Sequence, residues 1–175
     1  MRLVDADGVD VPQGEEGEIW VHGPNVMLGY HGLPEATAAV LQHGWYRTGD
    51  LARRDENGLV TISGRVKELI VRAGENIAPA EIENVLVACP GVEDAAVIGS
   101  PHEDLGEVPV ACIVSSPGRG LDHEEILRRC KERLAYFKVP AAIFEVPEIP
   151  RTGSGKIQRF RLHEVTQSED AVRVC

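Results

Sequence analysis

Residues 79–91 read PAEIENVLVACPG, and this stretch decides the fold of the second half of the chain. Pro79 suits the first turn of a helix, because its ring presets φ and its missing N–H is not needed there. Four apolar residues follow at i, i+3, i+4 and i+7 spacing: Ile82, Val85, Leu86 and Cys89. Pro90 and Gly91 then stop the helix. The stretch therefore predicts an amphipathic helix with one face available for packing.

Strand-like runs flank this helix on both sides. They cover residues 69–71, 95–98, 108–114 and 143–146. A second helix is expected from Asp122, because Glu125 follows three residues later in capping-box spacing. The resulting order is β-α-β-β-α-β, which predicts a compact α+β domain with helices packed on a sheet.

The first third of the chain has a different sequence pattern. Residues 17–22 alternate around Ile19 and Val21, and residues 59–62 form another short strand-like run after a turn at 55–58. A helix is expected from Pro34, ended by Gly44. This region is predicted to be a small twisted β subdomain with one helix. The residues from Ser168 to Cys175 are expected to form a loose tail.

Composition excludes several classes of protein. The chain has 175 residues, a hydrophobic content of 43% and a net charge of −10. The hydrophobic content argues for a packed core, and the negative charge argues against nonspecific binding to nucleic acid or anionic membranes. No run approaches the ~20 apolar residues of a membrane span, and the first residues show no signal peptide. A cytoplasmic location is expected.

The four cysteines are Cys89, Cys112, Cys130 and Cys175. They lie far apart and form no C-x-x-C pair, so neither a zinc site nor a redox motif is expected. Cys89 and Cys130 occupy apolar helix positions and are expected in the core.

Residues 150–161, PRTGSGKIQRFR, first suggest a phosphate-binding loop. A Walker A loop requires Gly where Pro150 stands and Ser or Thr where Ile157 stands, so that interpretation fails. The plain alternative is a flexible turn, since Gly and Ser favour loops. A lysine between glycines on a mobile loop can also swing to an anion and leave again, which makes Lys156 a candidate for a moving positive charge.

Two further stretches contain candidate binding residues. In the Thr-Gly-Asp run at 48–50, Asp50 can accept hydrogen bonds from both hydroxyls of a ribose, although this run alone favours a turn capped by Asp50. Alternation places Arg65 and Lys67 on one face of an extended segment, which suits an anionic ligand, an interface or simply a solvated strand. Residues 74–76 read as a turn by composition.

In this order, these stretches resemble the C-terminal part of adenylate-forming (AMP-binding) enzymes. That superfamily comprises acyl-CoA synthetases, nonribosomal peptide adenylation domains and luciferases. The segments that carry the resemblance are GEEGEI (14–19), GY (29–30), PEAT (34–37), YRTGD (46–50), GRVKE (64–68), NIAPAEIE (76–83) and PRTGSGKI (150–157). The match runs from residue 5 to about residue 162.

The resemblance implies a domain organisation. Residues 1–65 would be a remnant of the large N-terminal domain, namely its last β subdomain. Residues 66–167 would form the mobile C-terminal domain, a compact three-stranded sheet with helices and an N-terminal β-hairpin. Residues 168–175 would be the tail.

The resemblance also implies residue roles. Asp50 would hold the ribose hydroxyls of ATP, and Arg65 would contact the nucleotide. Lys156 would be the catalytic lysine that reaches the substrate carboxylate and the α-phosphate during adenylation. Lys67 would be the hinge about which the small domain rotates between two half-reactions. Gly74, Glu75 and Asn76 would line the channel for the pantetheine arm of coenzyme A.

The run ELIVRAG at 68–74 resembles acyl-CoA ligases rather than peptide-synthetase adenylation domains. The implied substrates are ATP, coenzyme A and a carboxylic acid, whether fatty, aryl or short-chain. The family's phosphate loop and its segment carrying the Mg²⁺ ligand are not found in the sequence. The isolated chain is therefore expected not to adenylate, and an N-terminal domain or a separate chain is the expected partner.

Three alternatives stay open at this point: a noncatalytic binding module, one half of a split enzyme and a fragment of a peptide-synthetase adenylation domain. By resemblance, Lys156 is also an expected target of a lysine acetyltransferase, since acetylation would remove its charge.

Overall fold

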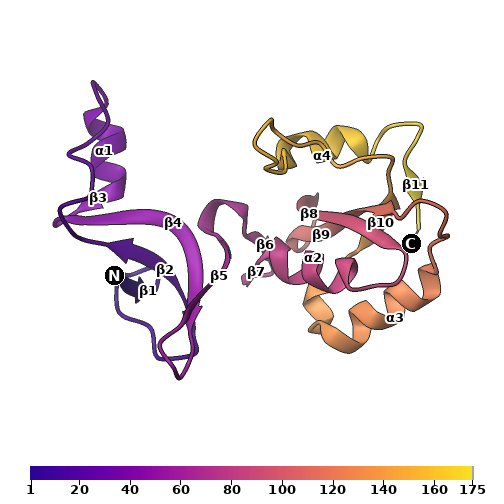
Figure 1. Ribbon diagram of the computed structural model, residues 1–175, viewed down its shortest axis with the longest axis horizontal. Helices are drawn as coiled ribbons and strands as arrows, with labels where there is room; N and C mark the ends of the chain where they lie inside the picture. Colours follow the sequence, from indigo (N-terminus) through magenta and orange to yellow (C-terminus); the bar gives the residue numbers. More distant parts are fainter. Residues whose placement is uncertain (175) are drawn as a thin grey trace. The chain divides into compact units, whose positions relative to one another are not determined.

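The computed structural model describes residues 1–174, and the chain divides into two compact units (Figure 1). The first unit is Met1–Lys67 and the second is Glu68–Cys175. The division falls after Lys67, close to the domain boundary expected after residue 65.

The first unit contains a five-stranded antiparallel sheet. Its strands are β1 (Arg2–Val4), β2 (Glu16–Val21), β3 (Leu41–Gln42), β4 (Trp45–Arg54) and β5 (Val60–Arg65). The long strand β4 pairs with β2, β3 and β5, and it curves strongly along its length (Figure 1). Register shifts interrupt its pairing with both β2 and β5, as expected where a strand bends at bulges.

Helix α1 (Pro34–Val40) begins at Pro34, as predicted, but it ends before Gly44. Leu41 and Gln42 form β3 instead, and they pair directly with the start of β4. His43 and Gly44 connect these strands with φ values of 50° and 82°, as a tight two-residue hairpin turn requires. Gly44 therefore serves the hairpin and not the end of the helix.

The first unit buries few apolar side chains. Its core comprises Leu3, Val4, Trp20, Leu51 and Ala52. Helix α1 contributes no buried residue. Several large apolar side chains of this unit are exposed instead, among them Val9, Leu28, Leu33, Leu59 and Ile62.

The second unit is the predicted α+β domain. Its strands are β6 (Ile70–Arg72), β7 (Glu75–Ile77), β8 (Val92–His102), β9 (Gly106–Ser115), β10 (Ala142–Glu145) and β11 (Val172–Arg173). The long strand β9 pairs antiparallel with β8 and parallel with β10, which gives the expected three-stranded centre. The hairpin β6–β7 and the short β11 extend the sheet to six strands.

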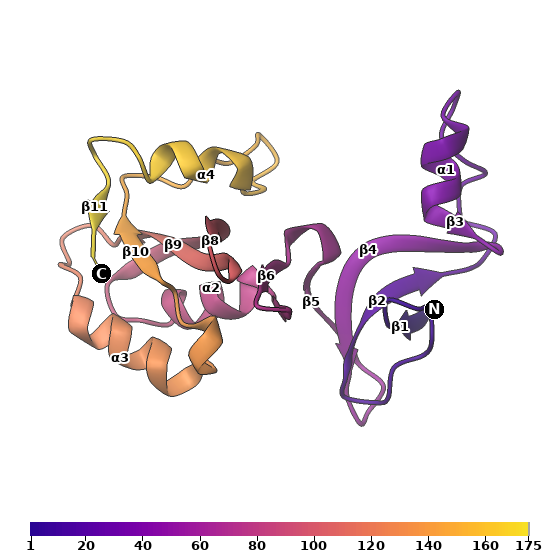
Figure 2. The same ribbon diagram turned by 180° about the vertical axis from the view of Figure 1, so that it is seen from behind.

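Helices cover both faces of this sheet (Figures 1 and 2). They are α2 (Pro79–Val87), α3 (His123–Arg133) and α4 (Arg159–Val165). Apolar residues of α2 and α3 pack with Val97 and Ala111 on one face, and Leu162 of α4 packs with Ala96 and Cys112 on the other. This double burial explains why residues 95–98 read as a continuous apolar run without alternation.

Two details differ from expectation in the second unit. Asp122 caps α3 by accepting a hydrogen bond from the Glu125 N–H at 3.0 Å, but the Glu125 carboxylate pairs with Arg128 and Arg129 and does not complete a reciprocal capping box. The tail is not loose up to residue 174, because β11 pairs with β10 and the Val174 N–H donates to a β10 carbonyl at 2.7 Å. Cys175 lies outside the described residues.

No helix in the described part of the chain combines the length and apolar character needed to cross a bilayer.

Candidate functional site

Asp50 and Arg65, the two residues expected to bind a nucleotide, lie side by side in the first unit. They are register partners across β4 and β5, and the Arg65 Nε lies 3.0 Å from the Asp50 Oδ1. Their side chains are 29% and 54% exposed, so solvent and a ligand can reach both. The pair therefore offers an acceptor carboxylate and a cation at one accessible place.

The backbone around Asp50 is an irregular strand and not the capped turn that composition also allowed. Ile19 alone on β2 lies opposite residues 48–50 on β4, because the register shifts there. Gly49 has a φ of +74°, which an L side chain rarely adopts. The Thr48 hydroxyl donates to the Ile19 carbonyl at 2.8 Å and accepts from the Asp50 N–H at 3.1 Å. The bulge therefore sets the position of Asp50 on the sheet.

Glu18 supports the same bulge, and the sequence patterns did not single it out. Its carboxylate is buried and accepts hydrogen bonds from the Trp20 indole at 3.0 Å, the Arg47 guanidinium at 3.0 Å and the Gly49 N–H at 3.1 Å. The alternating pattern was centred on Ile19 and Val21, which are only half-buried. Glu18 and Trp20, on the opposite face of β2, are the buried residues. A charged residue within a strand of apolar neighbours was the one signal available.

Lys67 does not share a strand face with Arg65. Strand β5 ends at Arg65, and Val66–Glu68 form a single 3₁₀ turn. The alternation expected for an extended segment therefore stops before Lys67. Within residues 1–174, the exposed Lys67 side chain makes no hydrogen bond or ion pair.

Residues 74–76 divide between a turn and a strand. Ala73 and Gly74 form the turn of the β6–β7 hairpin, with φ values of 50° and 88°. Glu75 and Asn76 belong to β7, where they pair with Arg72 and Val71. Of the three expected channel residues, only Gly74 is therefore in a turn.

The loop that carries Lys156 is bridged by its own backbone hydrogen bonds, whereas composition alone had suggested a flexible turn. The Thr152 N–H donates to the Lys156 carbonyl at 2.8 Å, and the Gln158 N–H donates to the Pro150 carbonyl at 2.8 Å. Gly155 closes the turn with a φ of +84°. The Lys156 side chain itself is exposed and, among the described residues, makes no hydrogen bond or ion pair. The loop thus presents an uncommitted cation.

Arg151 anchors the N-terminal end of this loop. Its guanidinium forms two hydrogen bonds with the Asp94 carboxylate, at 2.7 and 2.8 Å, and a third with the Gly155 carbonyl at 2.8 Å. Its backbone also forms an isolated β-bridge with Ile157. We refer to residues 150–158 as the lysine loop.

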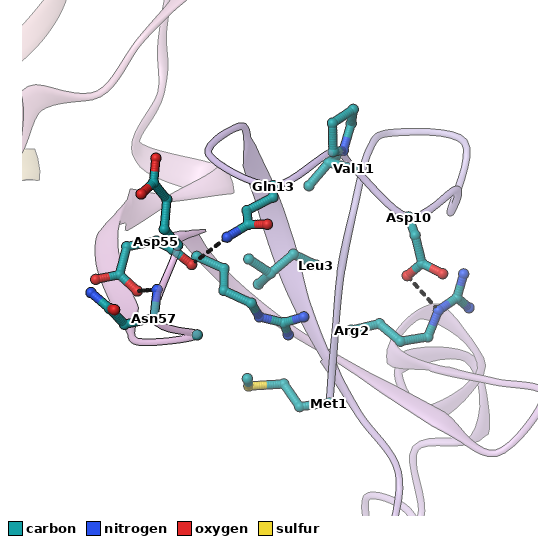
Figure 3. A pocket seen from close by; sticks show the side chains of 12 residues that line it. Met1, Arg2, Leu3, Asp10, Val11, Gln13, Asp55 and Asn57 are labelled. Atoms are coloured by element: carbon teal, nitrogen blue, oxygen red, sulfur yellow. Dashed lines mark hydrogen bonds and ion pairs between the residues drawn. The ribbon is translucent and has the colours of Figure 1, made fainter.

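A hollow of about 660 Å³ on the first unit lies elsewhere (Figure 3). Its walls contain the Arg2–Asp10 ion pair at 2.8 Å and a hydrogen bond from Gln13 to the Asp55 carbonyl at 2.8 Å. The hydrogen bond from Arg2 holds the pKa of Asp10 below its ordinary value. Neither Asp50 nor Arg65 lines this hollow, so it does not belong to the candidate site.

In residues 1–174, no three His, Cys, Asp or Glu side chains gather in an arrangement that could hold a metal ion.

Residues 81–156 match the family model described as the AMP-binding enzyme C-terminal domain. The chain contains this domain. It is 49% identical over 157 residues to a feruloyl-CoA synthase from Amycolatopsis sp., an alignment that covers 90% of this chain and 32% of that protein. It is also 45% identical to the indoleacetate–CoA ligase of Aromatoleum aromaticum, covering 91% of this chain and 31% of that protein.

A solved structure shows the same relationship. The o-succinylbenzoate CoA synthetase of Bacillus subtilis, in complex with its acyl-adenylate intermediate, aligns with a TM-score of 0.83 and 40% sequence identity. The alignment covers 91% of this chain and 33% of that one. The chain thus resembles the C-terminal part of acyl-CoA ligases and spans about a third of the length of these relatives. The predicted family resemblance is confirmed.

Proposed function

We propose that the chain acts as the C-terminal part of an ATP-dependent carboxylic acid–CoA ligase. In the first step, a carboxylate oxygen attacks the α-phosphorus of ATP, and the bond to the departing pyrophosphate breaks. In the second step, the thiol of coenzyme A attacks the acyl carbonyl, and AMP leaves. Support comes from the family match and from relatives that are named as CoA ligases.

The observation that carries the proposal is that the Lys156 side chain, on the hydrogen-bonded lysine loop, is exposed and has no hydrogen-bond or ion-pair partner among the described residues. The first step brings a carboxylate against a phosphate, so two anions must approach each other. A cation placed where negative charge develops lowers that barrier. A lysine already paired with a neighbouring carboxylate would be less available for this task.

Asp50 and Arg65 would serve the nucleotide. The Asp50 carboxylate would accept hydrogen bonds from the ribose hydroxyls, and the adjacent Arg65 would add a positive charge near the phosphates. Both side chains are accessible, and the bulge at residues 48–50 sets the direction of Asp50.

Lys67 and the β6–β7 hairpin would serve the second step. The attack of a thiol on an acyl adenylate does not require Lys156 at the α-phosphate. A rotation of the second unit about Lys67 would therefore remove Lys156 and bring Gly74, Glu75 and Asn76 to the path of coenzyme A. Hinges are short segments that absorb the backbone change of such a motion, and the single 3₁₀ turn at Val66–Glu68 is a segment of this kind.

The chain alone is proposed to be inactive. The exposed apolar side chains of the first unit, such as Leu28 and Ile62, offer surface for a further N-terminal domain or chain. That partner would provide the acyl pocket and the ligands for Mg²⁺, for which the described residues offer no cluster. The acid that is activated would be set by the partner.

An assembled enzyme tests this proposal. The N-terminal region of the Amycolatopsis feruloyl-CoA synthase would be joined to this chain in place of its own C-terminal third, and thioester formation from ferulate would be measured. The isolated chain is the control and would be assayed for ATP–pyrophosphate exchange with a panel of carboxylic acids. We expect the hybrid to form the thioester and the isolated chain to show no exchange. A folded hybrid without thioester formation, or robust exchange by the isolated chain, would contradict the proposal.

The same lysine is a proposed point of regulation. Acetylation would remove the charge of the exposed Lys156 and block the first step. Incubation of the hybrid with a lysine acetyltransferase, followed by mass spectrometry and the exchange assay, would show modified Lys156 together with lost exchange. Modification without loss of exchange would refute this mode of control.

A further inference from the structure

We propose that Arg159 is a positioning residue, which holds the lysine loop on the body of the second unit so that Lys156 is presented in a fixed place. Arg159 is the first residue of α4 and follows the lysine loop directly. The inference rests on the proposed function only for the role of Lys156. The structural claim, that Arg159 keeps the loop rigid, concerns this chain alone.

The Arg159 guanidinium binds three separate elements. Its Nε donates to the Glu68 carboxylate at 2.9 Å, and its Nη1 donates to the Val97 carbonyl at 2.9 Å. Its Nη1 and Nη2 both donate to the Glu83 carboxylate. We call Arg159, Glu68, Glu83 and Val97 the Arg159 cluster.

Glu83 completes the cluster from α2. Its carboxylate also accepts the Val97 N–H at 2.8 Å, so α2, α4 and β8 meet at Val97. The side chains of Arg159 and Glu83 are only 21% and 13% exposed. Charge-assisted hydrogen bonds are stronger than neutral ones, and the lower local dielectric of a partly buried place strengthens them further.

The cluster fixes the C-terminal end of the lysine loop. Lys156 lies three residues before Arg159, and three residues of chain span at most roughly 11 Å. The Arg151–Asp94 pair fixes the N-terminal end. Its side chains are 39% and 31% exposed, and exposed ion pairs contribute little to stability. Arg159 is therefore the stronger of the two anchors, and both hold the loop to β8.

The contact between Arg159 and Glu68 also links the lysine loop to the proposed hinge. Glu68 is the first residue of the second unit and follows Lys67, the proposed hinge. Because Arg159 binds Glu68, the chain leaving the hinge and the start of α4, directly after the lysine loop, are connected through one guanidinium. A rotation at Lys67 would carry Lys156 with it and would not be absorbed within the loop.

The chemistry calls for arginine at this position. The planar guanidinium has five N–H donors and can serve two carboxylates and a carbonyl at once, whereas lysine has a single nitrogen. Arg159→Lys keeps the charge but cannot keep these four contacts. Arg161→Gln is the matched control, because Arg161 lies on the same helix and is bonded only to the Gln158 side chain among the described residues.

Backbone order parameters of the 175-residue chain test the structural claim by NMR. In the wild type and in Arg161→Gln, the amides of residues 152–156 should show values near the ~0.85 of rigid backbone. In Arg159→Lys and Arg159→Gln, they should fall below the ~0.6 typical of flexible segments. Unchanged values in both Arg159 variants would overturn the inference.

A second variant covers the case in which Arg159→Gln does not fold. Glu83→Gln removes the charge that holds Arg159 yet keeps an oxygen acceptor for the Val97 N–H. It should loosen the same residues of the lysine loop. A rigid loop in folded Glu83→Gln would also overturn the inference.

Kinetics of the hybrid ligase test the link to Lys156. Arg159→Lys should lower ATP–pyrophosphate exchange by roughly 10- to 100-fold, while thioester formation from supplied acyl adenylate stays within about twofold. Equal loss of both steps would show a merely structural role and would overturn the positioning role. If the wild-type hybrid is inactive while the order parameters change as expected, the proposed function fails and the structural inference stands.

Discussion

Lys156 is the residue to which we assign the moving positive charge of the proposed first step. Its loop is held by backbone hydrogen bonds and by Arg151, so the side chain needs no contact of its own to keep its place. Composition had suggested a flexible tether between glycines. The glycine at 155 instead permits the tight turn, and the ordering of the loop reduces the entropy lost when the lysine engages a ligand.

Replacement of Lys156 by alanine in the hybrid ligase should separate the two steps. We expect ATP–pyrophosphate exchange to fall by about 10²-fold or more, because the developing charge loses its cation. Thioester formation from supplied acyl adenylate should be preserved. Lys131→Ala, an exposed lysine on α3, is the control and should change neither step. Parallel loss of both steps in Lys156→Ala would refute the role given to this lysine.

Cys112 provides a pH-dependent prediction. Burial in β9 raises the pKa of its thiol from 9.0 to about 11. Between these values, the unfolded chain releases a proton that the folded chain keeps, so stability is complete below pH 9 and declines as the pH rises toward 11. The decline attributable to this group is about 2–3 kcal/mol.

Urea unfolding of the wild type and of Cys112→Ala at pH 8 and at pH 11 would check this. We expect a smaller alkaline loss of unfolding free energy in Cys112→Ala. Equal alkaline losses in the two proteins would show that another group is responsible.

Among the elements, the β6–β7 hairpin contains a residue under backbone strain. Ala73 has a φ of +50°, a conformation that asparagine tolerates better than alanine. Ala73→Asn should therefore raise the free energy of unfolding by about 0.5–1 kcal/mol.

Gly74→Ala is the opposite variant at the neighbouring position. Its φ is +88°, and an added Cβ would meet no atom within 4 Å, so only backbone strain acts. It should lower the unfolding free energy by about 1 kcal/mol. Thermal melting of both variants would check the pair, and destabilisation by Ala73→Asn would argue against strain at Ala73.

Elements with a strong apolar pattern could be predicted from the sequence, and those without one could not. Pro79, the spacing of Ile82 and Leu86, and the Asp122 cap were sufficient for α2 and α3. Helix α4 was not expected, because it has no side-chain cap and buries only Leu162. Strand β4 was not expected, since its bulge at residues 48–50 breaks the alternation on which such a prediction depends.

The candidate site could likewise be predicted only in part from the sequence. Asp50, Arg65 and Lys156 were found because they lie in recognisable stretches of sequence. The pairing of Asp50 with Arg65 depends on the register of β4 and β5, and the partners of Arg159 lie 91 and 76 residues away along the chain. No spacing rule connects residues so far apart, so these contacts required the folded chain. The roles of the site residues stay predictions.

At the scale of the whole molecule, the two units differ in how much of their apolar surface they bury. The second unit has two clusters of buried side chains, one on each face of its sheet, and all members come from residues 70 onward. The first unit exposes many of its apolar residues. The second unit is therefore expected to fold alone, and the first to depend on a partner.

A chain of residues 68–175 tests this difference. We expect a single cooperative thermal transition and NMR amide shifts that match those of the same residues in the 175-residue chain, away from the new terminus. Residues 1–67 alone should show no cooperative transition. A molten or aggregated 68–175 chain would contradict the division into units.

The Arg159 cluster also bears on how molecules of this protein behave in concentrated solution. Strand β8 pairs only with β9 among the described strands, which leaves its outer side available to a strand of another molecule. At Val97, however, both the N–H and the carbonyl on that outer side are already occupied by Glu83 and Arg159. The contacts that we propose to position the lysine loop thus also occupy the outward-facing backbone groups of Val97, so their loss would free this point of β8 for pairing with a strand of another molecule.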